Sequence, residues 1–157
     1  MPGRRIDSAT GGGERVESGA AVVLVVDDEP AIRLVCKLNL RTAGFKTLEA
    51  PDGESALELA RSEQPDLILL DIMLPKSDGF TVAQELLAGA ETREIPIVFI
   101  TARSDVKDQL RGYEAGGVAF MTKPFDPDLL PETVRTTIER VRRGEREALR
   151  REWRATL

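Results

Sequence analysis

The sequence predicts an α/β fold, a three-layer sandwich in which five parallel strands form one sheet between two layers of helices. Short runs of apolar residues, many of them β-branched, alternate along the chain with amphipathic segments of helical period. This alternation is typical of repeated strand–helix units, whose parallel strands are buried on both faces. The 2-1-3-4-5 strand order is one common solution for five such units, and it is the order that we expect.

Each expected element is bounded by residues that favour its start or its end. We expect strands at residues 21–26, 45–48, 67–70, 95–100 and 118–122, each followed by a helix that begins near residue 30, 52, 80, 105 or 126. Pro30 suits a first helical turn, Asp52 suits an N-cap, and Gly44 suits a helix end. Pro131 falls early in the fifth helix and should kink that helix or delay its start.

Length and composition fit one domain with short tails. Of the 157 residues, 41% are hydrophobic and 31% are charged, as in a soluble globular protein. No apolar run approaches the roughly 20 residues of a membrane helix, and no signal-peptide core is present. A single cysteine, Cys36, suits a reducing compartment, so we expect a cytoplasmic protein without membrane partners. The chain has no histidine, which excludes a Ser-His-Asp triad and histidine metal ligands.

The charge pattern divides the chain into three parts. We expect a flexible, glycine-containing leader at residues 1–20, a folded domain at 21–143 and a short charged helical tail at 144–157. Acidic residues outnumber basic ones between residues 21 and 138, which argues against broad nucleic-acid binding by the domain itself. The tail is rich in arginine and carries Trp153. It fits a solvated extension of the fifth helix, a dimerisation or partner-docking helix anchored by Trp153, or contact with an anionic surface.

Polar side chains follow four of the predicted strands. Asp27 and Asp28 follow the first strand, Asp71 the third, Thr101 the fourth and Lys123 the fifth. Because the carboxyl ends of parallel strands lie on the same edge of a sheet, we expect these side chains to meet. Each alone has a simple structural explanation, such as a cap or a surface charge. Their joint placement indicates a binding site.

The residue types in this group suggest phosphoryl chemistry. Three crowded carboxylates repel one another, and Lys123 balances one charge, so a hard cation such as Mg²⁺ would stabilise them. A hydroxyl and an ammonium are donors suited to phosphoryl oxygens, and a carboxylate can act as nucleophile to form an aspartyl phosphate. Ala102, beside Thr101, is small enough to leave room for an incoming group.

From about residue 21 to residue 143 the sequence resembles the receiver domain of bacterial two-component response regulators. The resemblance rests on four motifs whose order and spacing are together highly specific: Val26-Asp27-Asp28-Glu29-Pro30, the stretch from Asp71 through Pro75 to Gly79, Thr101-Ala102, and Lys123-Pro124-Phe125. It implies that Asp71 accepts a phosphoryl group from a sensor histidine kinase or a histidine phosphotransfer protein. It also implies that Asp27, Asp28 and Asp71, with the backbone carbonyl of Met73, hold Mg²⁺.

The resemblance further implies a conformational switch. Thr101, with its neighbour Ala102, and Lys123 would contact the phosphoryl group, Phe120 would turn inward when Thr101 moves, and the Lys123–Pro124 peptide would be cis. The changeable surface would be the fourth helix, fifth strand and fifth helix, about residues 105–143. An unidentified downstream protein would bind there, and this surface or the tail helix could form a homodimer. Gly117-Val118-Ala119 replaces the polar residues usual before the switch aromatic, which suggests that this surface suits a particular partner.

Three alternatives remain open from the sequence. A chain ending 14 residues after residue 143 fits a stand-alone regulator, but it also fits a fragment of a longer one whose DNA-binding or enzymatic output domain is absent. An Asp-nucleophile phosphohydrolase of the haloacid-dehalogenase type would need a second Asp two residues after Asp71, where this chain has Met73. A degenerate receiver would act only as a scaffold. We therefore expect a signalling switch that turns over no external substrate, although it would hydrolyse its own aspartyl phosphate.

Overall fold

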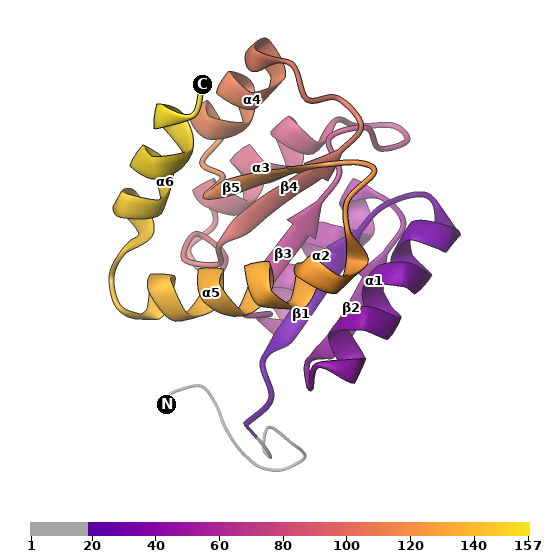
Figure 1. Ribbon diagram of the computed structural model, residues 1–157. Helices are drawn as coiled ribbons and strands as arrows, with labels where there is room; N and C mark the ends of the chain where they lie inside the picture. The colour runs from indigo at the N-terminus through magenta and orange to yellow at the C-terminus, as the bar shows by residue number, and fades with distance from the viewer. Residues whose placement is uncertain (1–18) are drawn as a thin grey trace.

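A single parallel sheet forms the centre of the computed structural model, which describes residues 19–157 (Figure 1). Its strands are β1 Val22–Val26, β2 Lys46–Ala50, β3 Leu67–Leu70, β4 Ile97–Thr101 and β5 Ala119–Thr122. They lie in the order β2-β1-β3-β4-β5, and every pair of neighbours is parallel. Both the predicted three-layer α/β fold and the predicted 2-1-3-4-5 order are thereby confirmed.

Helices cover both faces of this sheet, as the sequence predicted. They are α1 Pro30–Thr42, α2 Gly53–Glu63, α3 Gly79–Ala88, α4 Val106–Glu114, the 3-10 turn η1 Pro127–Leu129, α5 Leu130–Arg142 and α6 Arg146–Ala155. Pro131 lies in the first turn of α5, so the α-helix is preceded by the short 3-10 turn. The expected delay in the start of the fifth helix is confirmed.

Alternate residues of each central strand enter two separate hydrophobic clusters. In β1, Val23 and Val25 face α1 and α5, while Leu24 and Val26 face α2 and α3. All four are at most 1% exposed. Successive strand side chains point to opposite faces of a sheet, so a strand covered on both faces must be apolar at every position. The core therefore holds the carboxyl ends of the strands in fixed positions.

Aspartate side chains begin three of the helices. The carboxylates of Asp52, Asp78 and Asp105 each accept a hydrogen bond of 2.8 Å from the backbone N–H three residues ahead. These bonds satisfy N–H groups that have no partner within the helix. The cap at Asp78 starts α3 at Gly79, one residue earlier than the apolar pattern predicted, and it fixes the loop that leaves β3.

The C-terminal segment differs from one of its expected conformations. It is not a solvated extension of α5, because Gly144 has φ of +80° and reverses the chain, so that α6 returns against the domain. Trp153 in α6 is only 8% exposed. Figure 1 shows α6 beside β5, between α4 and α5. A left-handed φ is favourable for glycine, which explains why the helix breaks at this residue.

Two further expectations concern the N-terminal leader and membrane-spanning helices. Most of the leader expected at residues 1–20 lies outside the described residues, which begin at 19. Between residues 19 and 157, none of the helices combines the length and the apolar character needed to cross a bilayer.

Cys36 is fully buried in the α1 face of the core, and burial raises the pKa of its thiol to about 12.

Candidate functional site

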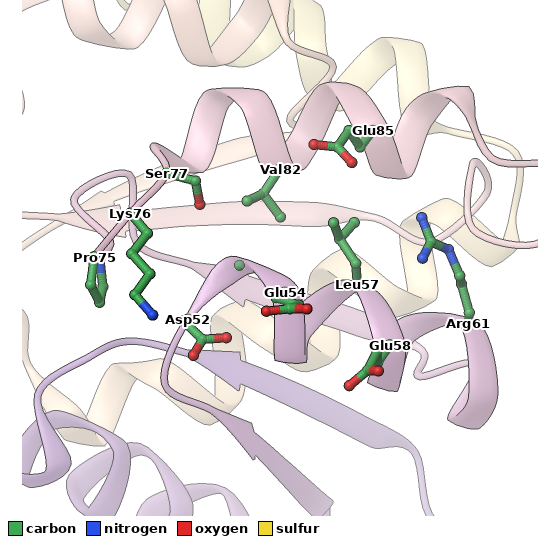
Figure 2. Close-up of a pocket in the computed structure, with 11 residues that line it drawn as sticks. Asp52, Glu54, Leu57, Glu58, Arg61, Pro75, Lys76, Ser77, Val82 and Glu85 are labelled. Atoms are coloured by element: carbon green, nitrogen blue, oxygen red, sulfur yellow. The ribbon is translucent and has the colours of Figure 1, made fainter.

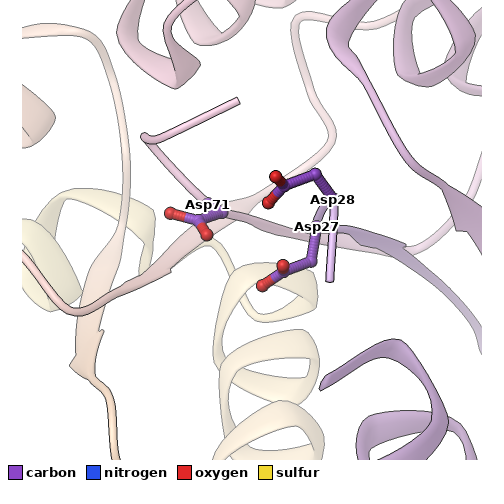
Figure 3. Close-up of side chains that lie close together, drawn as sticks. All are labelled: Asp27, Asp28 and Asp71. Atoms are coloured by element: carbon purple, nitrogen blue, oxygen red, sulfur yellow. The ribbon is translucent and has the colours of Figure 1, made fainter. Parts of the chain in front are cut away.

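The sheet register brings two of the predicted carboxylates together. Val26 of β1 pairs with Leu70 of β3, so the next residue of each strand, Asp27 and Asp71, lies at the same height on the sheet edge. The backbone N–H of Asp71 donates to the Val26 carbonyl at 3.0 Å and extends the pairing. Asp28 follows Asp27, and Figure 3 shows the three side chains gathered at this edge.

These three carboxylates are close enough to share a cation. Asp27, Asp28 and Asp71 each offer an oxygen within 4.8 Å of the others. Asp27 is fully buried, Asp71 is 4% exposed, and Asp28 is open to solvent. The group therefore has a buried floor and an open side, an arrangement that suits a metal ion retaining some of its waters.

Lys123 reaches this group from the end of β5. Its Nζ lies 2.7 Å from Asp27 Oδ2, 2.9 Å from Asp71 Oδ2 and 3.3 Å from Glu29 Oε1. Burial alone would lower the pKa of this ammonium, but the hydrogen bonds and charges of Asp27 and Asp71 outweigh burial and raise it. Lys123 is thus firmly protonated. The contact with Glu29 was not predicted, because Glu29 and Lys123 are 94 positions apart in the chain and no local pattern pairs them.

Asp27 provides the test of whether a cation fits. Its Oδ1 accepts a hydrogen bond of 2.9 Å from the Glu29 backbone N–H. Its Oδ2 lies 2.7 Å from Lys123 Nζ, and within residues 19–157 it has no other polar partner. Burial raises the pKa of Asp27 against the opposing effects of Lys123 and the Glu29 N–H. Lys123 balances only one of the three carboxylate charges of Asp27, Asp28 and Asp71, so this oxygen-rich group fits a divalent cation such as Mg²⁺.

Asp71 is held on both of its oxygens. Oδ1 accepts from the Met73 backbone N–H at 3.0 Å, and Oδ2 accepts from Lys123. The Met73 side chain is 52% exposed and lies outside the carboxylate group. The proposed use of the Met73 carbonyl as a metal ligand stays a prediction. A glycine shapes the loop behind Asp71, because a Cβ at Gly79 would clash with the backbone of Asp71 and Ile72.

Thr101 is buried at the end of β4, and its hydroxyl has a different partner. Its Oγ1 accepts a hydrogen bond of 3.2 Å from the Arg103 backbone N–H, and its carbonyl accepts from the Lys123 backbone N–H at 2.8 Å. Ala102 is exposed beside it. The Lys123–Pro124 peptide is cis. The structure therefore places Thr101 and Lys123 on paired strands at the site edge, with the Thr101 hydroxyl bonded to its own loop.

Phe120 lies away from the carboxylates, within a row of aromatic rings. Its ring centroid is 6.1 Å from that of Phe99 in β4 and 5.9 Å from that of Trp153 in α6. Trp153 also packs on Tyr113, with 5.8 Å between the ring centroids. The resemblance to receiver domains implied a switch role for Phe120, but no sequence feature indicated that Trp153 would cover this ring. Only long-range packing brings α6 to this surface.

A separate hollow of about 420 Å³ lies between α2 and α3. Figure 2 shows side chains of α2, including Glu54 and Leu57, facing Lys76, Val82 and Glu85 across it. Its lining mixes both signs of charge and includes none of the predicted site residues. The sheet edge, rather than this hollow, is the candidate functional site.

Comparisons with known proteins agree with this geometry. Residues 23–135 match the family model described as "Response regulator receiver domain". A relative from Synechocystis sp., described as the DNA-binding dual master transcriptional regulator RpaA, is 41% identical over 121 residues, which are 77% of this chain and 50% of the relative. The alkaline phosphatase synthesis transcriptional regulatory protein PhoP of Bacillus subtilis is 41% identical over 118 residues, 75% of this chain and 48% of that protein. The chain thus spans about half the length of the curated relatives it matches.

Solved structures give the same result. A putative response regulator from Chloroflexus aurantiacus has a TM-score of 0.73 and 32% identity, over 77% of this chain and 99% of that one. The chemotaxis response regulator CheY4 of Vibrio cholerae has a TM-score of 0.71 and 29% identity, over 74% of this chain and 98% of that one. The family match covers well over half of the sequence and includes all of the strand-end residues described above. The chain belongs to the family of response regulator receiver domains.

Proposed function

We propose that this chain is a phosphorylation-dependent signalling switch that accepts a phosphoryl group on Asp71. Receiver domains are signalling domains that histidine kinases phosphorylate and that act on a downstream output. The observation that carries the proposal is the arrangement around Asp71: a buried carboxylate within reach of two further carboxylates and a protonated lysine. A cap or a simple strand end would not require four charged groups at one point.

The chemistry follows from the charges of this group. A carboxylate oxygen of Asp71 attacks the phosphorus of a phosphohistidine on the partner, the P–N bond breaks, and the imidazole leaves with the electron pair. Mg²⁺, held by Asp27, Asp28, Asp71 and the Met73 carbonyl, would neutralise the developing charge on the phosphoryl oxygens. Lys123 already lies 2.9 Å from Asp71 Oδ2, so its ammonium can donate to the product without a large movement.

The remaining site residues would respond to the negative charge of the phosphoryl group on Asp71. The Thr101 hydroxyl, with Ala102 beside it leaving space, would turn from its bond with the Arg103 N–H to donate to a phosphoryl oxygen. Hydrolysis of the aspartyl phosphate in the same site would then remove the phosphoryl group from Asp71. The altered surface for a downstream protein would be the α4–β5–α5 face, which contains Phe120. A phosphohydrolase is not favoured, since Met73 occupies the position of the second aspartate that such an enzyme needs.

Intact-mass measurement tests the acceptor directly. The chain is incubated with Mg²⁺ and a cognate phosphorylated kinase, or with acetyl phosphate as a small phosphodonor. We expect the mass to increase by one phosphoryl group and the increase to be lost in Asp71→Asn. Asp128→Asn, which changes an exposed aspartate in η1, is the matched control and should be labelled like the unaltered chain. Equal labelling of Asp71→Asn would refute the assignment.

A further inference from the structure

Helix α6 is seated on the α4–β5–α5 face through its single tryptophan. The indole of Trp153 packs between Tyr113 of α4 and Phe120 of β5, and its Nε1 donates to Gln109 Oε1 at 3.1 Å. A buried indole with a satisfied N–H is an anchor of the kind that dominates protein interfaces. Figure 1 shows α6 lying along the side of the domain where α4, β5 and α5 meet.

Polar contacts fix the position of this helix from both sides. Arg150 donates to the backbone carbonyls of Tyr113 and Gly117 at 2.9 and 2.6 Å, and its guanidinium lies 4.0 Å from the centroid of the Tyr113 ring. On the other side, Arg140 of α5 makes two bonds of 2.7 Å to Glu152 of α6. The helix is therefore bound to this face as a ligand would be.

Gly117, which stands where a polar residue is usual in receiver domains, is compatible with α6 in this position. A Cβ at Gly117 would lie 2.6 Å from the Phe99 ring, and the Gly117 carbonyl accepts from Arg150. Of the small residues before Phe120, Gly117 thus contacts a helix of the same chain through its carbonyl, whereas Val118 and Ala119 pack on the opposite face of the sheet. Gly112 shows the same close approach, because a Cβ there would lie 3.0 Å from Phe99 and 3.4 Å from Trp153.

The two strands beneath α6 are the strands that end in the site. Phe99 and Thr101 lie on β4, and Phe120 pairs with Phe99 across to β5, three residues before Lys123. The Lys123 N–H donates to the Thr101 carbonyl, so the ends of β4 and β5 are linked. A displacement of Thr101 and Lys123 toward new charge at Asp71 would therefore act on the aromatic pair that supports Trp153.

We propose that α6 is an internal cap of the α4–β5–α5 face, and that a phosphoryl group on Asp71 releases it. The inference rests on the function proposed above. A modification can shift an equilibrium only through contacts that differ between the two states, and here those contacts are the Phe120 and Tyr113 rings beneath Trp153. While α6 is seated, these rings and the Tyr113 and Gly117 carbonyls are occupied, and a downstream protein meets them only after release.

Fluorescence of the only tryptophan tests the proposal in the full chain. Mg²⁺ and beryllofluoride, a phosphoryl mimic, are added while quenching of Trp153 by acrylamide is measured. We expect the released fraction to rise roughly tenfold, the change that loss of one well-packed aromatic pair produces in an equilibrium constant. Asp71→Asn with the same additions should show no rise. Bound beryllofluoride is recorded independently by ¹⁹F NMR.

The coupling between α6 and Asp71 must act in both directions, so release of α6 should also change the affinity for beryllofluoride. The ion pair between Arg140 and Glu152 is here called the clasp, and Glu152→Gln weakens it. Because this pair lies at the surface, the variant should raise the ratio of released to seated α6 roughly threefold without disturbing the core. Linkage then requires that Glu152→Gln bind beryllofluoride more tightly, by up to about twofold for a tenfold coupling and a threefold release. Glu139→Gln, an exposed change on α5 next to Arg140, is the matched control and should leave both quantities unchanged.

The possible outcomes separate the two proposals. A bound beryllofluoride signal with unchanged or reduced Trp153 quenching would overturn the cap and leave the acceptor function intact. Absence of a bound signal, together with absence of phosphoryl labelling, would overturn both. A bound signal with increased quenching in the unaltered chain, and tighter binding by Glu152→Gln, supports the cap.

Discussion

Replacing Lys123 with methionine should destabilise the domain strongly in the absence of Mg²⁺. Lys123 Nζ contacts three carboxylates, but the Glu29 side chain is 62% exposed, so that pair contributes little. The Asp27 and Asp71 side chains are 1% and 5% exposed, and Lys123→Met would leave both charges without their partner. Breaking a buried pair by removing one member costs about 3–5 kcal/mol, which corresponds to a fall in Tm of roughly 10 °C for a chain of this size.

Urea unfolding followed by circular dichroism measures this change. Lys37→Met is the matched control, since among residues 19–157 Lys37 pairs only with Glu49, at 3.5 Å, and both side chains are about one-third exposed. We expect the control to cost about 0–1 kcal/mol. Added Mg²⁺ should restore more stability to Lys123→Met than to the unaltered chain, because the cation replaces the lost positive charge.

A double-mutant cycle identifies the cause. In an Asp27→Asn background one of the two buried charges is absent, so Lys123→Met should cost at least about 1 kcal/mol less than in the unaltered chain. The reasoning would be refuted if Lys123→Met cost no more than Lys37→Met, or if its cost were unchanged by Asp27→Asn. Either result would mean that Lys123 does not compensate buried carboxylate charge.

Three further predictions concern other parts of the molecule. Gly79→Ala should lower the free energy of unfolding by about 1–3 kcal/mol in urea titrations and slow phosphoryl uptake, because its Cβ meets the backbone of Asp71; labelling at the normal rate would contradict this. Cys36, whose pKa is raised to about 12 by burial, should react with a thiol reagent at pH 8 only after denaturation, and rapid native labelling would contradict its burial. The hydrogen bonds from Arg140 lower the pKa of Glu152 below its ordinary value of 4.5, so the clasp stabilises α6 above about pH 4.5 and is lost as pH falls through the lowered value. Tryptophan quenching should therefore increase on acidification, and it should do so less in Glu152→Gln.

The sequence by itself determined the elements and the edge where the site forms. Runs such as 67–70 are apolar at every position, which only strands covered on both faces require, and parallel strands must then bring their following residues to one edge. Asp27, Asp71 and Lys123 could be grouped in this way without knowing any distance. The cap at Asp52 and the effect of Pro131 depend on local chemistry and could be predicted in the same way.

Tertiary structure decided what local pattern could not. Whether Asp27 is buried and Asp28 exposed depends on the packing around them, and the contact of Lys123 with Glu29 joins residues far apart in the chain. The tail shows this most clearly. Its sequence predicts a charged helix with one tryptophan, which fits a solvated extension, a dimerisation or partner-docking helix, or contact with an anionic surface. Docking on its own domain was not among these alternatives. It depends on the surface formed by Tyr113, Phe120 and Gly117, because burial requires complementary surfaces contributed by distant segments.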